Sequence, residues 1–320
     1  MEHIVGLAVI EGNLQKRRIA LLSGGVGGAR LARGLAQIQT VDLTVVVNVG
    51  DDDEIYGLCI SPDLDTVLYT LAGAEGPDGW GVRGDTFRVL DRLAAFGIDT
   101  EFRIGDLDFA VHLCRTMQLR KGLTLSVVTD QLRKSFGVGT VILPASNEPI
   151  RTKVKTDDGW LAFQDYFVAR RHRDRVTNVR FDGAAKAAAA PGVEHAIRTA
   201  DLVVIGPSNP PLSIWPVLAV PDIALAVEAA PRVMAISPLF GGKALKGPAD
   251  RVLESLGFPP GNEGVAAAYE DILSDFVIDT DDAADADRIS SNRLRVHVAD
   301  TRIAATEPAA RFGSWLAELA

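Results

Sequence analysis

Short apolar runs alternate with amphipathic segments along most of the chain. Each apolar run stops at a loop rich in glycine, proline or polar residues, as buried parallel strands do; the runs cover 18–22, 43–48, 202–205 and 232–236. Amphipathic patterns predict helices over 31–38, 62–71, 85–96, 108–121 and 126–136. This alternation predicts an α/β fold with a Rossmann-like, mostly parallel sheet and helices on both faces.

The middle of the chain departs from this alternation. Its helical patterns predict a helical cap over the sheet. Residues 152–156 and 160–168 flank the turn Asp157-Asp158-Gly159, which predicts a small antiparallel hairpin insertion. We therefore expect one α/β domain over 18–320, with the cap and insertion at about 75–180. Residues 1–17 are expected to form an N-terminal extension.

Composition and charge narrow the classes of partner. With 320 residues, 47% of them hydrophobic, the chain can bury one large core or two smaller ones. The net charge of −9 argues against a nucleic-acid partner, because such a protein needs a basic face. The apolar run 4–10 is too short to cross a membrane. We expect a cytoplasmic protein with no membrane or nucleic-acid partner.

The cysteines and histidines indicate no catalytic or metal centre. Cys59 and Cys114 are far apart in sequence and lack the spacing of metal ligands. No histidine pairs with a serine or cysteine in a recognisable catalytic order. A core or surface role is therefore expected for His112, which lies on the predicted helix 108–121.

The first strand runs into a glycine-rich turn that contains Gly24, Gly25, Gly27 and Gly28. Glycines let backbone N–H groups approach a phosphate closely, and the N-terminus of the following helix adds partial positive charge. The turn is not a Walker loop, and Arg30 stands where the third glycine of a dinucleotide fingerprint belongs. It predicts a nucleotide or phosphate site; the alternative is that the glycines only permit close packing of strand and helix.

Acidic residues follow the second strand and begin the second helix. Asp51 and Asp52 come directly after the strand, and Asp63 and Asp65 lie in the segment PDLDT. Carboxylates beside a phosphate site would repel the phosphate unless a cation lay between them, so the cluster predicts Mg²⁺, with Asp51 and Asp52 as candidate ligands. The alternative is a solvated turn followed by a helix that Asp63 caps.

Further polar groups are expected at the same edge of the sheet, because ligands of open α/β sheets collect beyond the carboxyl ends of the strands. Asn48 ends the second strand and is a binding candidate. Ser208 and Asn209 lie in a loop constrained by prolines, where a hydroxyl and an amide suit a sugar, base or phosphate. Lys243 and Lys246 flank a glycine-rich segment suited to a second anionic group; surface lysines that are merely solvated are the alternative.

A series of segments, taken in order, resembles the 2-phospho-L-lactate transferase family of deazaflavin coenzyme F-420 biosynthesis. The matching segments are 23–29, 46–57 (VVNVGDDDEIYG), 61–73 (SPDLDTVLYTLAG), 83–87 (RGDTF), 206–214 (GPSNPPLSI) and 237–249 (SPLFGGKALKGPA). They extend through nearly the whole chain, which makes the resemblance far more specific than the glycine turn alone.

The resemblance implies a transferase that uses Mg²⁺. It moves a phospho-three-carbon-acid group from a guanosine-diphosphate-linked donor to the terminal ribityl hydroxyl of the deazaflavin Fo and releases GMP. The transferred group is 2-phospho-L-lactate, or phosphoenolpyruvate in bacterial members. A donor that carries glycerate is a third alternative. By similarity, Asp65 and Arg103 are assigned to Fo, and Asp51, Asp52 and Asp63 are candidates for contact with the metal or the hydroxyl. Asp65 and Asp63 are the catalytic candidates. The glycine turn and Ser208–Asn209 are assigned to the nucleotide, and a homodimer is expected.

Two other functions fit the sequence less well. Nucleotide-sugar-binding regulators of the gluconeogenesis type share the first loop but lack the segment PDLDT, so the presence of Asp63 and Asp65 favours the enzyme. A nicotinamide-dependent dehydrogenase is disfavoured, because no acidic residue closes the second strand in the usual ribose-binding way.

Overall fold

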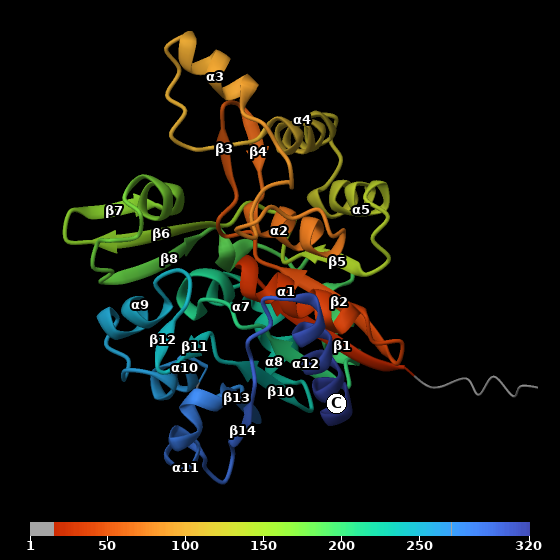
Figure 1. Ribbon diagram of the computed structural model, residues 1–320, viewed down its shortest axis with the longest axis vertical. Coiled ribbons are helices and arrows are strands. Elements are labelled where there is room, and N and C mark those ends of the chain that lie inside the picture. Colours follow the sequence, from red (N-terminus) through yellow and green to blue (C-terminus); the bar gives the residue numbers. More distant parts are fainter. Residues whose placement is uncertain (1–15, 270) are drawn as a thin grey trace, which may run out of the picture.

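The computed structural model describes residues 16–269 and 271–320, and a seven-stranded sheet forms its centre (Figure 1). All neighbouring strands in this sheet are parallel, which confirms the predicted α/β architecture. The strand order is β14-β13-β10-β9-β1-β2-β5. The strands are β1 (Arg17–Ser23), β2 (Val41–Val47), β5 (Val141–Pro144), β9 (Leu202–Ile205), β10 (Val233–Ile236), β13 (Asp275–Asp279) and β14 (Arg295–Ala299).

The sheet grows in two directions from β1. One way it continues to β2 and β5, and the other way to β9, β10, β13 and β14. The chain therefore has its topological switch point between β1 and β9, where loops diverge and leave a crevice beyond the carboxyl ends of the strands. The glycine turn follows β1 at this point, so the topology alone places the turn in the crevice.

Helices cover both faces of the sheet, which explains why β9 and β10 are buried along their whole lengths. Right-handed crossovers put helices on opposite faces where the sheet grows in opposite directions. On one face α1 packs against α2 and α12, and on the other α6 packs against α8. These helices are α1 (Gly25–Ala36), α2 (Pro62–Leu71), α6 (Val193–Thr199), α8 (Pro221–Glu228) and α12 (Thr306–Leu319).

A small three-stranded antiparallel sheet forms the insertion, in the order β7-β6-β8. Its strands are β6 (Arg151–Thr156), β7 (Gly159–Ala162) and β8 (Asn178–Asp182). The predicted hairpin is present, but its second strand ends at Ala162, and the chain continues as the π-helical turn η1 (Asp165–Ala169). Tyr166 on this turn packs with Val154 into a small core of its own, which is why the strand pattern does not continue to residue 168.

A projection stands on the sheet beside this insertion and reaches the far end of the molecule at α3 (Figure 1). It contains β3 (Asp53–Ile55), β4 (Leu58–Ile60), α3 (Arg88–Ala95), α4 (Asp106–Arg120) and α5 (Leu125–Ser135). After α5 the chain returns to the central sheet, because β5 pairs with β2 in parallel. The region expected to be one cap and insertion at 75–180 is thus divided in two by a strand of the main sheet.

Two boundaries at the start of the chain differ from expectation. The strand β1 begins at Arg17, inside the predicted extension, and residues 1–15 lie outside the described part. The helix α1 begins at Gly25 rather than at residue 31, because the glycines form its first turn. The glycine turn is therefore the N-terminus of a helix, not a loop before one.

The remaining short elements connect these layers. They are η2 (Ala184–Lys186), η3 (Pro210–Ile214), α7 (Trp215–Leu218), β11 (Leu239–Phe240), β12 (Lys243–Ala244), α9 (Ala249–Ser255), α10 (Asn262–Ala267), η4 (Thr280–Asp285) and α11 (Ala286–Ile289). Across 16–269 and 271–320 no single helix is long and apolar enough to span a membrane. One pair, 210–218 with 221–228, meets the length and composition criteria only when both parts are joined across a 93° bend.

Candidate active site

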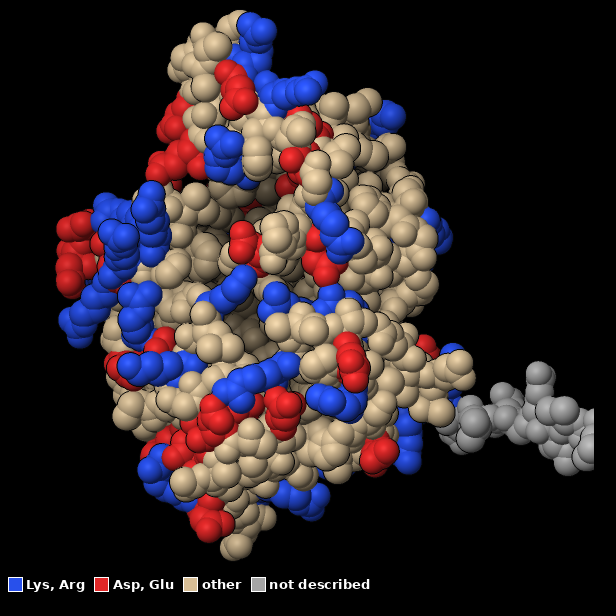
Figure 2. All heavy atoms as spheres, viewed as in Figure 1, with Lys and Arg blue, Asp and Glu red and all other residues tan. Residues whose placement is uncertain are grey.

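A cavity of about 1020 Å³ opens where the loops after β1, β2, β9 and β10 meet the projection and the insertion. Figure 2 shows a hollow in the middle of this face, with acidic side chains inside it and basic side chains around it. Most of the residues predicted for the site line this cavity. They are Gly24, Gly25, Gly27, Asp51, Asp63, Asp65, Arg103, Ser208, Asn209 and Lys246.

Four predicted residues do not line the cavity. Gly28 packs behind it, where a Cβ would collide with Ser23. Asn48 lies beneath the carboxylates and Asp52 turns away from them, whereas Lys243 is exposed on β12. Gly28 thus fits the packing alternative, and Asn48 supports ligand-binding groups rather than facing a ligand itself.

The glycine turn is held closely by its neighbours. The Ser208 hydroxyl donates to the Gly24 carbonyl at 2.6 Å, and the Gly25 N–H donates to Asp63 Oδ1 at 2.6 Å. A Cβ at Gly24 would lie 2.6 Å from Asp63 Oδ2 and 2.7 Å from the Cβ of Ser213, which leaves room only for glycine. Asp63 therefore caps α1, while Ser61 is the N-cap residue of its own helix α2.

Asp51 and Asp63 form a buried acidic pair, only 6% exposed each, that shares one amide. Asn48 Nδ2 donates to Asp63 Oδ2 at 2.9 Å and to Asp51 Oδ1 at 3.3 Å. Burial raises the pKa of Asp63 to about 6. Burial, followed by repulsion from Asp63, raises the pKa of Asp51 well above its usual range. Two buried carboxylates this close are costly as anions unless a cation joins them.

The two acidic side chains that follow β2, Asp51 and Asp52, contact different partners. Asp52 accepts a hydrogen bond from the Ser61 hydroxyl at 2.9 Å, and burial raises its pKa to about 8. The side chain of Asp51 instead joins that of Asp63, from the next helix. The carboxylate oxygens of the Asp51–Asp63 pair are the hard donors that Mg²⁺ prefers, and they face the cavity beside a helix N-terminus. The chemistry of this pair fits the ion better than Asp51 with Asp52.

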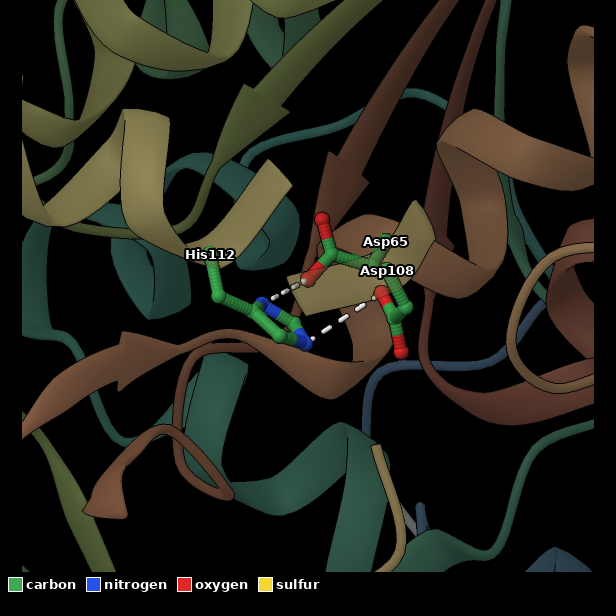
Figure 3. A group of neighbouring side chains, drawn as sticks. All are labelled: Asp65, Asp108 and His112. Carbon is green, nitrogen blue, oxygen red and sulfur yellow. Dashed lines mark ion pairs between the residues drawn. The ribbon is translucent and has the colours of Figure 1, made fainter. Parts of the chain in front are cut away.

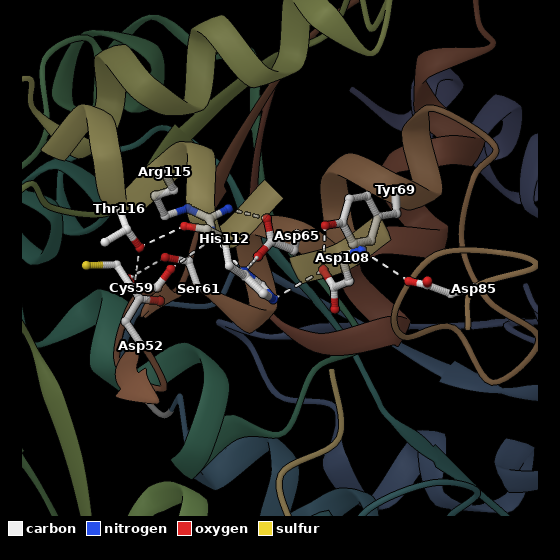
Figure 4. Close-up of polar contacts among 10 residues, drawn as sticks. All are labelled: Asp52, Cys59, Ser61, Asp65, Tyr69, Asp85, Asp108, His112, Arg115 and Thr116. Atoms are coloured by element: carbon white, nitrogen blue, oxygen red, sulfur yellow. Dashed lines mark hydrogen bonds and ion pairs between the residues drawn. The ribbon is translucent and has the colours of Figure 1, made fainter. Parts of the chain in front are cut away.

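Asp65 lies two residues further along α2 than Asp63 and belongs to a different network, which Figure 4 shows. Its Oδ1 is paired with the guanidinium of Arg115 on α4. Burial raises the pKa of Asp65, and the charge of Arg115 acts in the opposite direction. Asp108, also on α4, accepts from the Tyr69 hydroxyl at 2.6 Å and lies 3.2 Å from His112 Nε2.

Asp65, Asp108 and His112 lie close enough together to resemble a metal site (Figure 3). Arg115 argues against that role, because its guanidinium already occupies Asp65 Oδ1 and approaches His112 Nδ1 at 3.1 Å. A cation at this position would face a fixed positive charge. The Asp51–Asp63 pair, which has no such cation beside it among the described residues, is therefore the better candidate for a metal site.

His112 and Arg115 are site residues that sequence reasoning missed. Both are 2% exposed, and His112 lines the cavity rather than having only a core or surface role. The available signal was spacing, since Asp108, His112 and Arg115 share one face of a helix at i, i+4 and i+7. Nothing in the local sequence indicates that this face meets Asp65, because only the tertiary fold brings α4 to α2.

Basic and aromatic groups complete the cavity. The Arg103 guanidinium lies 4.2 Å from the centroid of Phe87. Lys246 Nζ donates to the Asp78 carbonyl at 3.0 Å and lies 5.6 Å from the centroid of Trp80, so this lysine reaches across to the projection. Aromatic side chains beside cationic ones suit a flat ring system with attached anionic groups. The aromatic lining consists of Tyr69, Trp80, Phe87, Phe102, Phe163, Phe167 and Phe240.

Two further donors lie near the glycine turn, on Asn209 and Arg30. Asn209 Nδ2 is buried without a hydrogen-bond partner among the described residues, although Asn209 Oδ1 accepts from the Leu212 N–H at 3.2 Å. Arg30 lines the cavity at the position of the missing third glycine. Burial, with a contribution from Arg33, lowers its pKa. Both groups are suited to phosphate or sugar oxygens.

Known proteins resemble the chain along most of its length. A family model described as 2-phospho-L-lactate transferase matches residues 19–308. A 2-phospho-L-lactate transferase of Methanopyrus kandleri is 41% identical over 256 residues, 79% of this chain and 82% of that protein. A phosphoenolpyruvate transferase of Streptomyces griseus is 40% identical over 313 residues, 94% of this chain and 98% of that protein. A UPF0052-family protein from Bacillus halodurans shares the fold, with a TM-score of 0.58 and 21% identity over 89% of this chain and 88% of that one.

Proposed function

From the premise that the chain belongs to the 2-phospho-L-lactate transferase family and is a transferase, we propose its substrates. The donor is a three-carbon acid, phosphoenolpyruvate or 2-phospho-L-lactate, linked through its phosphate to GMP. The acceptor is the terminal ribityl hydroxyl of the deazaflavin Fo, and the product belongs to coenzyme F-420 biosynthesis. One observation carries this proposal: a helix N-terminus, an uncompensated carboxylate pair and an aromatic wall face a single cavity.

The reaction is a substitution at phosphorus. The hydroxyl oxygen of Fo bonds to the phosphorus that carries the acid, and the bond from that phosphorus to the oxygen of the GMP phosphate breaks. GMP leaves with the electron pair of the broken bond, and the hydroxyl proton passes to a base. Such a reaction requires alignment of the reactants and neutralisation of the phosphate charge, without a covalent enzyme intermediate.

The residues around the glycine turn are assigned to the donor. The first turn of α1 directs backbone N–H groups toward the cavity, and Asn209 and Arg30 supply further donors. The Asp51–Asp63 pair would hold Mg²⁺, which when bound neutralises charge on the two phosphates. Lys246 provides a cation on a flexible stem for the carboxylate or phosphate of the donor.

The residues of the projection are assigned to the acceptor. Arg103 and the aromatic lining are suited to the deazaflavin ring, whose faces are apolar and whose edges carry polar atoms. Asp65 lies between this wall and the Asp51–Asp63 pair on the same helix start, where its carboxylate can accept the proton of the ribityl hydroxyl. The two substrates would therefore meet above α2.

The test is a transfer assay with Fo, Mg²⁺ and guanylyl donors that carry enolpyruvate, lactate or glycerate. Mass spectrometry should detect the Fo-phospho-acid product and GMP with at least one donor. Asp65→Asn is expected to abolish transfer and to keep the fold, while Asp42→Asn, an exposed position on β2, should be as active as the wild type. If no donor gives product while UDP-sugars bind tightly, the regulator reading replaces the enzyme.

A further inference from the structure

Arg115 is the largest fully buried side chain of the described residues, and its guanidinium reaches three acceptors. Nη2 pairs with Asp65 Oδ1, and Nη1 approaches His112 Nδ1 at 3.1 Å and the Cys59 carbonyl at 3.4 Å. A buried guanidinium is costly unless its N–H groups are paired, and its planar fork fixes the direction of each bond. Both Nη groups of Arg115 have acceptors, whereas its Nε has no hydrogen-bond partner among the described residues. Arg115 therefore determines where the carboxylate of Asp65 points.

The contact between Arg115 and His112 also determines where the imidazole carries its proton. A guanidinium has no acceptor, so the short Nη1–Nδ1 contact requires a lone pair on Nδ1. The proton of the neutral ring then sits on Nε2 and is donated to Asp108 Oδ1, 3.2 Å away. The Tyr69 hydroxyl donates to the same oxygen, so Asp108 is fixed from two sides. His112, itself held by Asp108, thus fixes the position of the Arg115 guanidinium.

The second oxygen of Asp65 is left open by this arrangement. Oδ2 lies 3.4 Å from His112 Nδ1, but no proton is available between these two acceptors. Oδ2 is buried and has no hydrogen-bond partner among the described residues, while Asp65 lines the cavity and is 4% exposed. An unpaired buried carboxylate oxygen is costly, so its presence in a cavity points to a donor that arrives with a ligand.

We propose that Arg115, braced by His112, is a positioning residue that holds Asp65 Oδ1 and presents Oδ2 as the acceptor for the substrate hydroxyl. The inference rests on the proposed function for the identity of that hydroxyl, the ribityl alcohol of Fo. Helix α4 of the projection thus helps to align the substrate hydroxyl, although neither Arg115 nor His112 is the base. Arg115 fixes the orientation of the Asp65 carboxylate, and His112 keeps the Arg115 guanidinium in place.

Substitutions that keep one function and remove another test the proposal. Arg115→Lys keeps the charge but loses the fork, and kcat should fall about 100-fold, as expected for a misaligned reactant. The KM for the guanylyl donor should stay unchanged, because the donor does not meet Asp65. Arg120→Lys is the matched control, since Arg120 is exposed on the same helix and contacts only the Gly57 carbonyl among described partners.

Two substitutions of His112 separate its two nitrogens. Asn places an acceptor near Nδ1, whereas Gln places a donor near Nε2. We expect His112→Asn to keep kcat within about threefold of the wild type and His112→Gln to lose about 30-fold, because bracing Arg115 requires the acceptor. The opposite order, or a loss in Arg115→Lys that appears equally in donor KM, would overturn the proposal. Thermal melts in parallel confirm that each variant compared is folded.

A measurement without turnover keeps this inference separate from the proposed function. Nitrogen-detected NMR of the imidazole, with His112 assigned from the His112→Gln variant, should show an unprotonated Nδ1 and a protonated Nε2. A proton on Nδ1 would refute the inference even if the enzyme is active. Fluorescence titration with Fo should show weaker binding by about tenfold in Asp65→Asn and Arg115→Lys alike. If the wild type binds Fo but yields no product with any donor, the proposed transfer fails while the positioning role stands.

Discussion

The cavity contains two buried carboxylate groups that differ in their counter-charge. Among the described residues, the Asp51–Asp63 pair accepts hydrogen bonds from the Asn48 amide and a backbone N–H, whereas Asp65 is paired with a buried guanidinium. Both are contributed in part by the first turn of α2, two residues apart. Burial without a counter-charge leaves a place for a cation from solution, and burial with a built-in counter-charge fixes an orientation.

The comparison also supports the proposal that the start of α2 contacts both substrates. A carboxylate that waits for a cation is suited to phosphates, since the cation can bridge both anions. A carboxylate whose charge is already balanced has no need of a cation, and its free oxygen is suited to a neutral donor such as an alcohol. We therefore expect Asp63 to act on the donor, through the cation, and Asp65 to act on the acceptor.

The largest effect is expected from removing the uncompensated pair. Asp63→Asn should lower kcat by about 10³-fold or more, because the phosphate charge loses its cation. Isothermal titration with Mg²⁺ should show lost binding in the same variant. Glu54→Gln is the matched control, because it also removes one negative charge, from an exposed side chain on β3. If Asp63→Asn still bound Mg²⁺, the Asp51–Asp63 pair would not be the cation site, and it would not differ from Asp65 in the way proposed.

The next effect concerns stability, where the two groups should respond with opposite signs. Arg115→Met leaves Asp65 buried and unpaired, and should lower the free energy of unfolding by about 3–5 kcal/mol. Asp51→Asn removes a buried repulsion, so it should raise the stability of the protein in the absence of Mg²⁺. Chemical denaturation in EDTA measures both. Equal destabilisation by the two substitutions would show that the pair is compensated by a contact other than a cation.

Sequence patterns predicted the site residues that lie in loops at the carboxyl ends of the parallel strands. Parallel strands bring their carboxyl ends to one edge, so the glycine turn, Asp51 and Ser208 could be expected together from order and topology alone. The same reasoning could not tell Asp51 from Asp52. Successive residues in a turn point to different sides, and here one faces Asn48 and the other faces Ser61.

The network around Asp65 could not be predicted in the same way. Arg115 is separated from Asp65 by 50 residues, and the contact depends on how the projection folds back on α2. A buried arginine also has no sequence signature, since an arginine on an amphipathic helix is normally exposed. The start of α1 at Gly25 was missed for a related reason: glycine disfavours helix locally, and packing against Ser208 and its neighbours overrides that preference.

A smaller effect should appear as a pH dependence of stability without Mg²⁺. The pKa of Asp63 in the folded protein, about 6, lies above its ordinary value of 3.8, so the folded state binds more protons than the unfolded state between these values. Stability should therefore fall as pH rises from about 4 to 6, with Tm dropping on the order of 5 °C. Asp52, with a pKa of about 8, should extend the fall to higher pH.

Mg²⁺ and one substitution separate the two contributions to that slope. Saturating Mg²⁺ should reduce the fall between about pH 4 and 6, because the bound ion favours the ionised pair. Asp52→Asn should reduce the fall across the whole range from about pH 4 to 8, including the part above about pH 6 that Asp63 does not cause, because its pKa lies at about 8 in the folded protein. Differential scanning calorimetry across this range measures both. A slope that Mg²⁺ leaves unchanged would argue against a cation at Asp51 and Asp63.

The smallest effect is expected from the lysines, which carry charge on flexible stems rather than in a fixed fork. Lys246 lines the cavity and reaches the Asp78 carbonyl, whereas Lys243 is exposed on β12 outside the lining. Lys246→Ala should raise the KM of the guanylyl donor about threefold to tenfold and leave kcat nearly unchanged, because its charge adds binding common to ground and transition states. Lys243→Ala should leave both constants at the wild-type value. Steady-state kinetics at two salt concentrations completes the test, since a charge contact near solvent weakens as salt rises and the contact of Arg115 with Asp65, being buried, does not.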